Sequence, residues 1–216
     1  MFSAFIFLCY HIQIMIKAIV FDYGGVIEKE DGDLIQKIAD YLKITKEAWH
    51  KVYFSFNHLA NTGKKSWQEV LAIVCREFGA SDIQISDIHK IIKENKKTKK
   101  INWELIEVIK DLKKKNYKIG LLSNNSTGLK QKLVDQNIVD FFDEIIISME
   151  FGYQKPQPEI FEILFNKLGV KNNEMIFVDD TERSLEGAEK IGYIPALYKD
   201  NETLKSELSN ILGIKF

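Results

Sequence analysis

The chain has 216 residues, of which 45% are hydrophobic. This length exceeds one average domain, so we expect one large domain with a smaller insertion. The 30 basic and 31 acidic residues leave a net charge of -1, which excludes a strong general attraction to nucleic acid or to an anionic membrane. The two cysteines, Cys9 and Cys75, form no CxxC or Cys/His motif. This argues against a disulfide framework or a zinc site and favours a reducing, cytoplasmic setting.

The first 14 residues are strongly apolar, but they lack a basic start and a small-residue cleavage site. They are also too short to span a bilayer. Because Met15, Ile16 and Lys17 lead directly into a strand-like run, we expect residues 1–14 to be an N-terminal extension that the fold does not need. An extra strand at the edge of a sheet is the alternative.

An apolar run at residues 18–21 stops at Asp22 and is followed by Gly24 and Gly25. A run of apolar residues this short predicts a strand that is buried on both faces. In open parallel sheets, ligands bind just beyond the carboxyl ends of the strands, and glycines let a ligand approach the backbone. Asp22 is therefore placed for chemistry, although a simple turn after a strand would give the same pattern.

Residues 31–100 show the periodicity of helices. Apolar residues recur at helical spacing, Thr45 is placed to cap a helix, and Ser66 with Glu69 has the form of a capping box. We expect this segment to be a helical insertion. The lysine-rich run at residues 93–100 is predicted to be a solvated linker that returns the chain to the first domain.

After residue 101 strands and helices alternate. We predict strands over residues 117–122, 144–147, 175–178 and 194–198, helices over 127–136 and 185–191, helices that open near Asn102 and Pro158, and a last amphipathic helix. This alternation predicts right-handed crossovers and a parallel sheet with helices on both faces. The predicted fold is therefore α/β, with a Rossmann-like parallel sheet core over residues 15–30 and 101–216 and a small helical domain over residues 31–100, which the resemblance described below implies to be a cap domain.

Polar residues stand at the ends of the predicted strands. They are Asp22 after the first strand, Ser123 and Asn124 after the second, Lys155 beyond the third, and Asp179 and Asp180 after the fourth. Carboxylates suit Mg²⁺, cations and backbone amides neutralise phosphate oxygens, and an aspartate can accept a phosphoryl group. Together in one crevice, this set would fit phosphoryl transfer. Singly, each has a structural explanation as a helix cap or a surface charge.

The same residues carry a family resemblance. In chain order the segments are Phe21-Asp22-Tyr23-Gly24-Gly25-Val26, Leu122-Ser123-Asn124, Gly152-Tyr153-Gln154-Lys155-Pro156-Gln157-Pro158 and Phe177-Val178-Asp179-Asp180. The chain in this respect resembles the haloacid dehalogenase-like hydrolases from residue 17 to about residue 198. The resemblance implies that the helical insertion is a mobile cap. It also implies that the first and fourth strands lie side by side at a topological switch point.

The resemblance further implies a role for each site residue. The implied metal ligands are Asp22, Gly24 through its backbone carbonyl, Asp180 as the main second carboxylate, and Asp179 beside it. The implied catalytic residues are Asp22 as nucleophile and Lys155, which restrains it, and the implied substrate-binding residues are Ser123, Asn124 and Lys155. The implied cofactor is Mg²⁺, and the implied partner is a small-molecule phosphate ester rather than nucleic acid or a membrane.

Two positions depart from the family pattern. Most phosphatases of this family have an aspartate two positions after the nucleophile as general acid and base, and here that position is Gly24. Proton transfer of this kind contributes about 10²–10⁴-fold. The leaving group must then be good, the cap or the substrate must supply the proton, or turnover must be slow. The second departure is Ser184, where relatives often have Asn or Asp, which affects the outer shell of the metal site.

The sequence leaves three functions open. The first is an Mg²⁺-dependent phosphatase that acts on a small phosphorylated metabolite, such as a sugar phosphate, through an aspartyl-phosphate. The second is a metal-free dehalogenase, whose subfamily has tyrosine two positions after the nucleophile, whereas Tyr23 follows Asp22 directly. The third is a non-catalytic binding or regulatory protein, which Gly24 makes plausible. The cap segment 54–59, with His58, is the first place to seek substrate contacts or a proton donor. The sequence does not indicate the oligomeric state.

Overall fold

A computed structural model describes residues 15–30 and 32–216. Five strands form one parallel sheet in the order β5-β4-β1-β6-β7. They are β1 (Ala18–Phe21), β4 (Lys118–Ser123), β5 (Glu144–Ile147), β6 (Met175–Asp179) and β7 (Ile194–Leu197). The predicted α/β fold with a Rossmann-like parallel sheet is confirmed. The extension expected over residues 1–14 lies outside the described residues.

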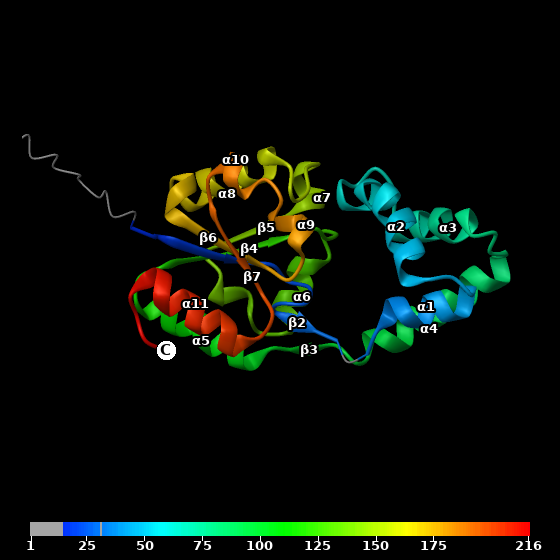
Figure 1. Cartoon of the computed structure of the whole chain (residues 1–216), viewed down its shortest axis with the longest axis horizontal. Helices are drawn as coiled ribbons and strands as arrows, with labels where there is room; N and C mark the ends of the chain where they lie inside the picture. The colour runs from blue at the N-terminus through cyan, green and yellow to red at the C-terminus, as the bar shows by residue number, and fades with distance from the viewer. Residues whose placement is uncertain (1–14, 31) are drawn as a thin grey trace, which may run out of the picture.

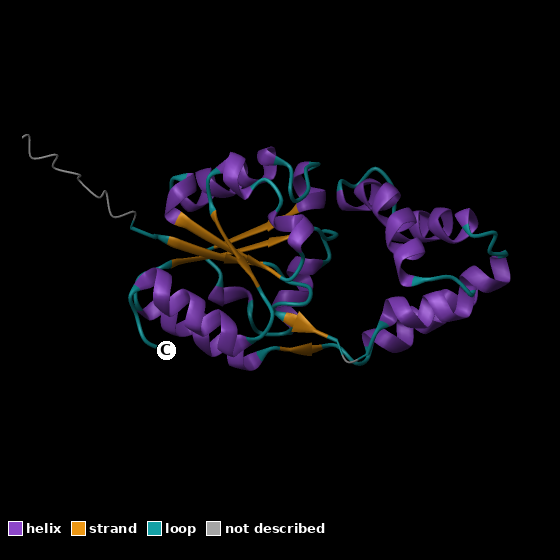
Figure 2. Ribbon diagram, viewed as in Figure 1, coloured by secondary structure: helices purple, strands orange, loops and turns teal. Residues whose placement is uncertain are grey.

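Helices cover both faces of this sheet (Figures 1 and 2). One face is packed by α5 (Trp103–Lys114), α6 (Leu129–Asp135) and α11 (Asn201–Leu212), and the other by α8 (Pro158–Leu168) and α10 (Ala188–Ile191). Strand β1 shows why two layers form: Ile19 and Phe21 belong to the first apolar cluster, and Ala18 and Val20 to the second. Successive side chains of a strand point to opposite faces, so a strand that is apolar throughout requires cover on both sides.

The helical insertion forms a separate lobe with its own apolar cluster (Figure 1). We call this lobe the cap and the lobe that contains the sheet the core. Its helices are α1 (Leu34–Leu42), α2 (Lys46–Asn61), α3 (Trp67–Glu77) and α4 (Asp82–Lys96). Thr45 caps α2, and Ser66 and Glu69 form the predicted capping box of α3. An antiparallel ribbon of β2 (Glu28–Lys29) and β3 (Lys100–Ile101) carries the chain into and out of this lobe. The domain boundaries expected from the sequence stay a prediction.

Two predicted segments differ from the structure. The single helix predicted over residues 185–191 is wrong, because α9 (Glu182–Leu185) ends there and α10 starts at Ala188. Between them Gly187 adopts a φ of 92°, which no regular helix tolerates. The linker predicted over 93–100 is wrong in its first half, because α4 continues to Lys96. Short helical turns also occur at α7 (Ser148–Phe151), Val139–Phe141 and Asn172–Glu174.

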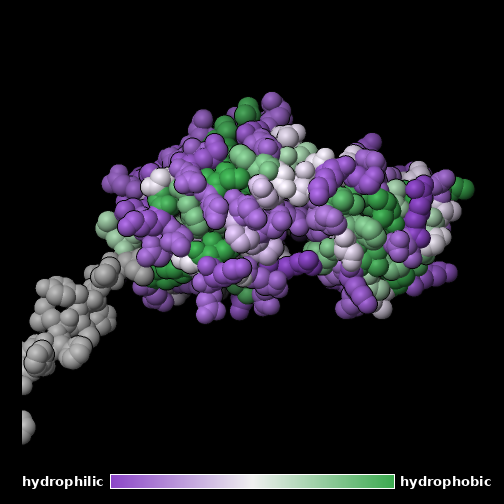
Figure 3. Space-filling model, turned by 90° about the horizontal axis from the view of Figure 1, so that it is seen from above, coloured by the Kyte–Doolittle hydropathy of each residue, from purple (hydrophilic) through white to green (hydrophobic). Residues whose placement is uncertain are grey.

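The sheet topology sets the position of the polar strand ends. Strand β1 pairs with β4 on one side and with β6 on the other, as expected for the first and fourth strands predicted from the sequence. In the space-filling view from above, the two lobes touch and hydrophilic residues cover much of the visible surface (Figure 3). Within the described ranges, we find no helix with the length and apolar character that crossing a bilayer requires.

Candidate active site

The carboxyl ends of β1, β4 and β6 open into a cavity of about 340 Å³ between the two lobes. From the core, the lining residues are Asp22, Gly24, Ser123, Asn124, Asn125, Gln154, Lys155, Pro156, Asp180, Thr181, Arg183 and Ser184, and from the cap they are Tyr53, Phe54, Asn57 and Asn61. Because parallel strands end at the same edge of the sheet, residues from distant parts of the chain meet here. Every predicted site residue except Asp179 is therefore part of this lining, and Asp179 lies buried directly beneath it.

Lys155 is the centre of the buried polar contacts. Its Nζ lies 2.8 Å from Oδ1 of Asp22 and donates a hydrogen bond to Oδ2 of Asp179 at 2.6 Å. The lysine is 5% exposed and its ammonium group lies over the ring of Phe177. A buried charge is tolerated only where it is paired and hydrogen-bonded. The ammonium group therefore restrains Asp22 and stabilises its buried charge.

Burial shifts the pKa values of the charged groups around Lys155. Desolvation raises the pKa of the Asp22 carboxyl to about 6, the Lys155 ammonium opposes the rise, and the Asp179 carboxylate adds to it. Burial, followed by the charge of Asp179, also raises the pKa of Asp180. Desolvation alone would lower the pKa of Lys155, but the two carboxylates hold it above its ordinary value. The cluster carries more negative than positive charge, which favours the binding of a cation.

Three carboxylates are placed to share such a cation. Asp22, Asp179 and Asp180 each offer an oxygen, and these oxygens lie within 4.8 Å of one another. Asp179 already accepts hydrogen bonds from Lys155 and from the Thr181 amide, whereas Asp180 is exposed to the cavity. Hard carboxylate oxygens with access to water are the ligands that Mg²⁺ prefers. The donor set fits this ion, with Asp22 and Asp180 more available to it than Asp179.

The two glycines after Asp22 have different surroundings. Gly25 has a φ of 77°, and a Cβ atom added there would overlap the carboxylate of Asp180, so only glycine permits this close approach. Gly24 has no heavy atom within 4 Å of the position of an added Cβ. A side chain at residue 24 would therefore meet open space beside the carboxylate cluster. The aspartate that the resemblance led us to expect at this position is absent, although there is room for its side chain.

The predicted substrate-binding residues have distinct environments. Ser123 ends β4 and is 3% exposed, with its remaining accessible surface at the cavity. The Asn124 side chain donates to the backbone carbonyl of Lys155 at 3.2 Å and accepts from the amide of Lys155 at 2.8 Å. These two bonds fix the backbone from which the lysine side chain extends. The contribution of Asn124 seen in the structure is thus to hold Lys155.

Tyr23 turns away from the cavity. Its hydroxyl lies 2.9 Å from Oε1 of Glu28 and 2.9 Å from Oε1 of Gln136, so it can donate a hydrogen bond to either, and the residue is 2% exposed. Glu28 also contacts Lys132 through an ion pair of 2.6 Å. Tyr23 therefore anchors the ribbon that leads to the cap and is not part of the cavity lining.

The cap contributes one face of α2 to the cavity. Tyr53, Asn57 and Asn61 recur every four residues, and Phe54 lies beside them, so they share one side of the helix. His58 is not among the lining residues described by the structure. Burial raises the pKa of the Tyr53 phenol, so its proton is held more tightly than in water. None of these cap groups is matched to proton donation near neutral pH.

Against this geometry, comparisons with known proteins identify the family. A family model described as haloacid dehalogenase-like hydrolase matches residues 16–192. The chain belongs to this family. Its curated relatives include bifunctional epoxide hydrolase 2 of Sus scrofa, 29% identical over 54% of this chain and 22% of the relative. They also include a glyceraldehyde 3-phosphate phosphatase of Methanothermobacter thermautotrophicus, 34% identical over 47% of this chain and 45% of the relative. The chain thus spans less than half the length of either relative.

A solved structure shows the same fold. The haloacid dehalogenase family enzyme of Bacteroides thetaiotaomicron, in complex with magnesium and inorganic phosphate, superimposes with a TM-score of 0.59. The two chains are 23% identical, and the match covers 85% of this chain and 94% of that one. At this level of identity the comparison establishes the fold of this haloacid dehalogenase-like hydrolase.

Sequence reasoning missed several lining residues of this haloacid dehalogenase-like hydrolase. Gln154, Thr181 and Arg183 lie next to recognised motif residues, but their types carry no signature of their own. The four-residue spacing of Tyr53, Asn57 and Asn61 was visible in the sequence, and it would have indicated one helical face. The cap segment 54–59 was the predicted place for substrate contacts, and it contributes Phe54 and Asn57 to the lining, whereas Tyr53 and Asn61 lie outside that segment.

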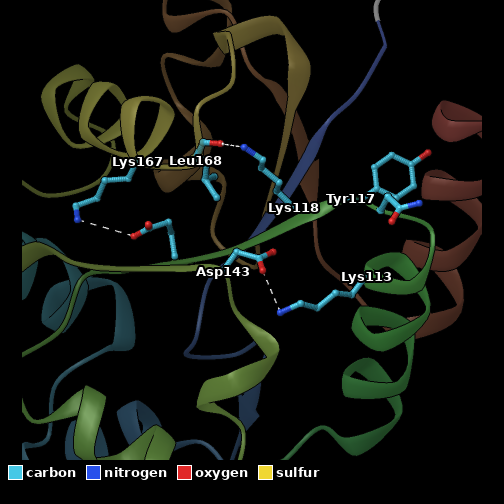
Figure 4. A pocket seen from close by; sticks show the side chains of 8 residues that line it. Lys113, Tyr117, Lys118, Asp143, Lys167 and Leu168 are labelled. Carbon is cyan, nitrogen blue, oxygen red and sulfur yellow. Dashed lines mark hydrogen bonds and ion pairs between the residues drawn. The ribbon is translucent and has the colours of Figure 1, made fainter.

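A second hollow, of about 390 Å³, lies at the opposite edge of the sheet, where β4 and β5 begin (Figure 4). Lys113 pairs with Asp143 at 3.1 Å, Lys167 lies 3.8 Å from Glu144, and Lys118 donates to the carbonyl of Leu168. Each of these three cations already has a partner within the chain. The Lys118 partner is a neutral carbonyl, so charge pairing alone does not rule this hollow out. Its lining contains none of Asp22, Ser123, Lys155 and Asp180, and the candidate active site is therefore assigned to the cavity that contains Asp22.

Proposed function

We propose that this protein is an Mg²⁺-dependent phosphatase that hydrolyses a small phosphorylated metabolite through an aspartyl-phosphate on Asp22. The observation that carries the proposal is the position of Lys155 Nζ, bonded to both Asp22 and Asp179 beneath a cavity that Asp180 lines. This arrangement combines an oriented carboxylate nucleophile, a cation for phosphoryl oxygens and a carboxylate cluster for a metal ion. The magnesium and phosphate named for the solved relative support it.

The proposed reaction proceeds in two displacements. The carboxylate of Asp22 attacks phosphorus, the bond from phosphorus to the leaving oxygen breaks, and that oxygen takes a proton from water. A water molecule then attacks the aspartyl-phosphate, which releases inorganic phosphate and restores the carboxylate. Lys155 and the Ser123 hydroxyl hold phosphoryl oxygens throughout. Bound Mg²⁺ would supply positive charge that stabilises the developing charge on those oxygens.

The proposed partner is a small phosphate ester, and the proposed setting is the cytoplasm. A cavity of about 340 Å³ accommodates a metabolite rather than a polymer. The net charge of -1 provides no general attraction to nucleic acid. The phosphatase named among the relatives acts on glyceraldehyde 3-phosphate, and this supports a sugar phosphate as the class of substrate.

The first test is metal-dependent hydrolysis of phenyl phosphate. After treatment with EDTA, the protein is expected to release inorganic phosphate only when Mg²⁺ is restored, because Asp22 and Asp180 repel the phosphoryl group without a cation between them. Phosphate release at the same rate in EDTA would contradict the metal requirement. Absence of release with Mg²⁺ from every ester in a panel of phosphorylated metabolites would contradict the phosphatase assignment.

Gly24 leads to a second prediction, on leaving groups. Because no described lining residue outside the carboxylate cluster is suited to protonate the departing oxygen, kcat/KM is expected to fall steeply as the leaving group becomes more basic. Aryl, acyl or anomeric phosphates should be preferred over simple alkyl phosphates. Gly24→Asp should restore a proton donor, since an added side chain meets open space. It should raise the rate with alkyl phosphates by up to about 10²-fold.

The control for this variant is Gly24→Asn, which has nearly the same shape but carries no acidic proton. Only the aspartate should flatten the dependence on leaving-group basicity, measured as the slope of log kcat/KM across a series of phenyl and alkyl phosphates. If wild type hydrolyses alkyl esters as fast as aryl esters while chemistry limits the rate, another residue donates the proton.

A further inference from the structure

Among the described residues that line the active-site cavity, Arg183 is the one cation without an ion-pair partner. Four charged residues line this cavity: Asp22, Lys155, Asp180 and Arg183. Lys155 is neutralised by its two carboxylate partners. Within residues 15–30 and 32–216, Arg183 forms no ion pair or hydrogen bond with the protein, and its side chain is exposed. Its charge is therefore available to whatever enters the cavity.

The guanidinium group is held where the two lobes meet. It lies 4.6 Å from the centroid of the Phe54 ring, which belongs to α2 of the cap. Arg183 itself belongs to α9, which begins two residues after Asp180, on the side of the core that faces the cap (Figure 1). A second contact joins the lobes nearby, since Asn61 donates to Gln154 at 2.8 Å. Arg183 thus lies at the outer part of the cavity, while Asp22 and Lys155 form its buried end.

Stacking on an aromatic ring leaves the edge of a guanidinium group free. The five N–H groups of arginine lie in the guanidinium plane, and their fork matches the two oxygens of a carboxylate. Contact of the guanidinium group with the Phe54 ring restricts the movement of the side chain and lowers the entropy lost when it binds a ligand. The other cap residues that line the cavity, Tyr53, Asn57 and Asn61, are uncharged. Among these residues, Arg183 is therefore the one that can bind a second negative charge on the substrate.

We propose that Arg183, supported by Phe54, binds a carboxylate on the part of the substrate that does not carry the reacting phosphoryl group. This inference rests on the proposed phosphatase function and specifies its substrate as a small phosphoester with a carboxylate. A second phosphate would bring up to about two negative charges close to Asp180. A carboxylate brings one, and its planar shape matches the restricted fork.

Binding of two phosphonates tests this proposal without any need for turnover. The probes are 4-carboxybenzylphosphonate and 4-carbamoylbenzylphosphonate, which have the same shape and differ in charge at the end distant from phosphorus. Their Kd values are measured by calorimetry on the full chain with Mg²⁺. Wild type is expected to bind the carboxylate about 10-fold more tightly than the amide, because a charge-assisted bond is made only with the former. Arg183→Gln should abolish that preference, and Phe54→Leu should reduce it.

Arg76→Gln is the matched control, because Arg76 lies in the cap outside the cavity and pairs with Asp82. This variant should keep the full preference for the carboxylate. Equal Kd values in wild type, a preference that survives Arg183→Gln, or failure of both probes to bind would each overturn the proposal. Turnover of 4-carboxyphenyl phosphate is measured separately. Arg183-dependent binding without turnover would support the carboxylate site while the phosphatase assignment failed.

Discussion

Replacing Asp22 with asparagine is expected to abolish phosphate release from phenyl phosphate, with a loss of at least about 10³-fold in kcat, as when a nucleophile is removed. The amide is nearly isosteric with the carboxylate but is a poor nucleophile towards phosphorus. Its oxygen can still accept a hydrogen bond from Lys155, which lies 2.8 Å from Oδ1 in the native protein. Lys155 also keeps its bond to Asp179, so the fold should be preserved.

Phosphate release and the thermal midpoint of unfolding are measured for wild type and for Asp22→Asn. Asp33→Asn serves as the control, because Asp33 is exposed, caps α1 away from the cavity, and asparagine caps a helix equally well. The control should retain full activity. If Asp22→Asn kept more than a few per cent of the wild-type rate, with deamidation excluded by mass spectrometry, the covalent mechanism would be wrong.

The strand ends could be predicted from the sequence because their signals are local. Apolar runs that end at Asp22, Ser123 and Asp179 have the lengths of strands buried on both faces, and helical periodicity lies between them. Their convergence could not be read from these runs alone. The adjacency of β1 and β6, which brings Asp22 beside Asp179, was implied by the family resemblance and is confirmed by the pairing of the strands.

The elements that were missed have weak or misleading local signals. Strands β2 and β3 contain two residues each, which is too short for any alternation to be visible. The lysines at 93 and 96 were interpreted as part of a linker, but lysine has high helix propensity and suits the last turn of α4. Gly187 ends a helical pattern that the apolar residues around it would otherwise continue.

The cavity shows a different limit of prediction. The buried end consists of motif residues, and each is recognisable because the proposed phosphoryl transfer restricts the residue types that can serve it. The outer end is formed by contacts between lobes, such as Arg183 with Phe54 and Asn61 with Gln154. These pairs are more than 90 residues apart in the sequence. The outer end of the cavity is therefore set by long-range packing, which one sequence does not reveal.

Lys155→Met is expected to remove both activity and stability. Methionine fills a similar volume, but it leaves the carboxylates of Asp22 and Asp179 buried without their cation. Removal of one partner of a buried ion pair costs about 3–5 kcal/mol, because the remaining charge is desolvated and unpaired. Urea denaturation should therefore show a fall in the free energy of unfolding of about 3 kcal/mol or more. Phosphate release should fall to background, because the nucleophile loses its restraint and the phosphoryl oxygens lose a cation.

Lys17→Met is the matched control for stability. Lys17 forms an ion pair of 2.8 Å with Glu174, but its side chain is 45% exposed. Exposed pairs contribute about 0–1 kcal/mol, so this variant should unfold at nearly the wild-type urea concentration and keep full activity. If Lys155→Met were as stable as Lys17→Met at pH 7, the two buried carboxylates would have to be neutral or solvated. The account of Lys155 as the residue that fixes the charged nucleophile would then be wrong.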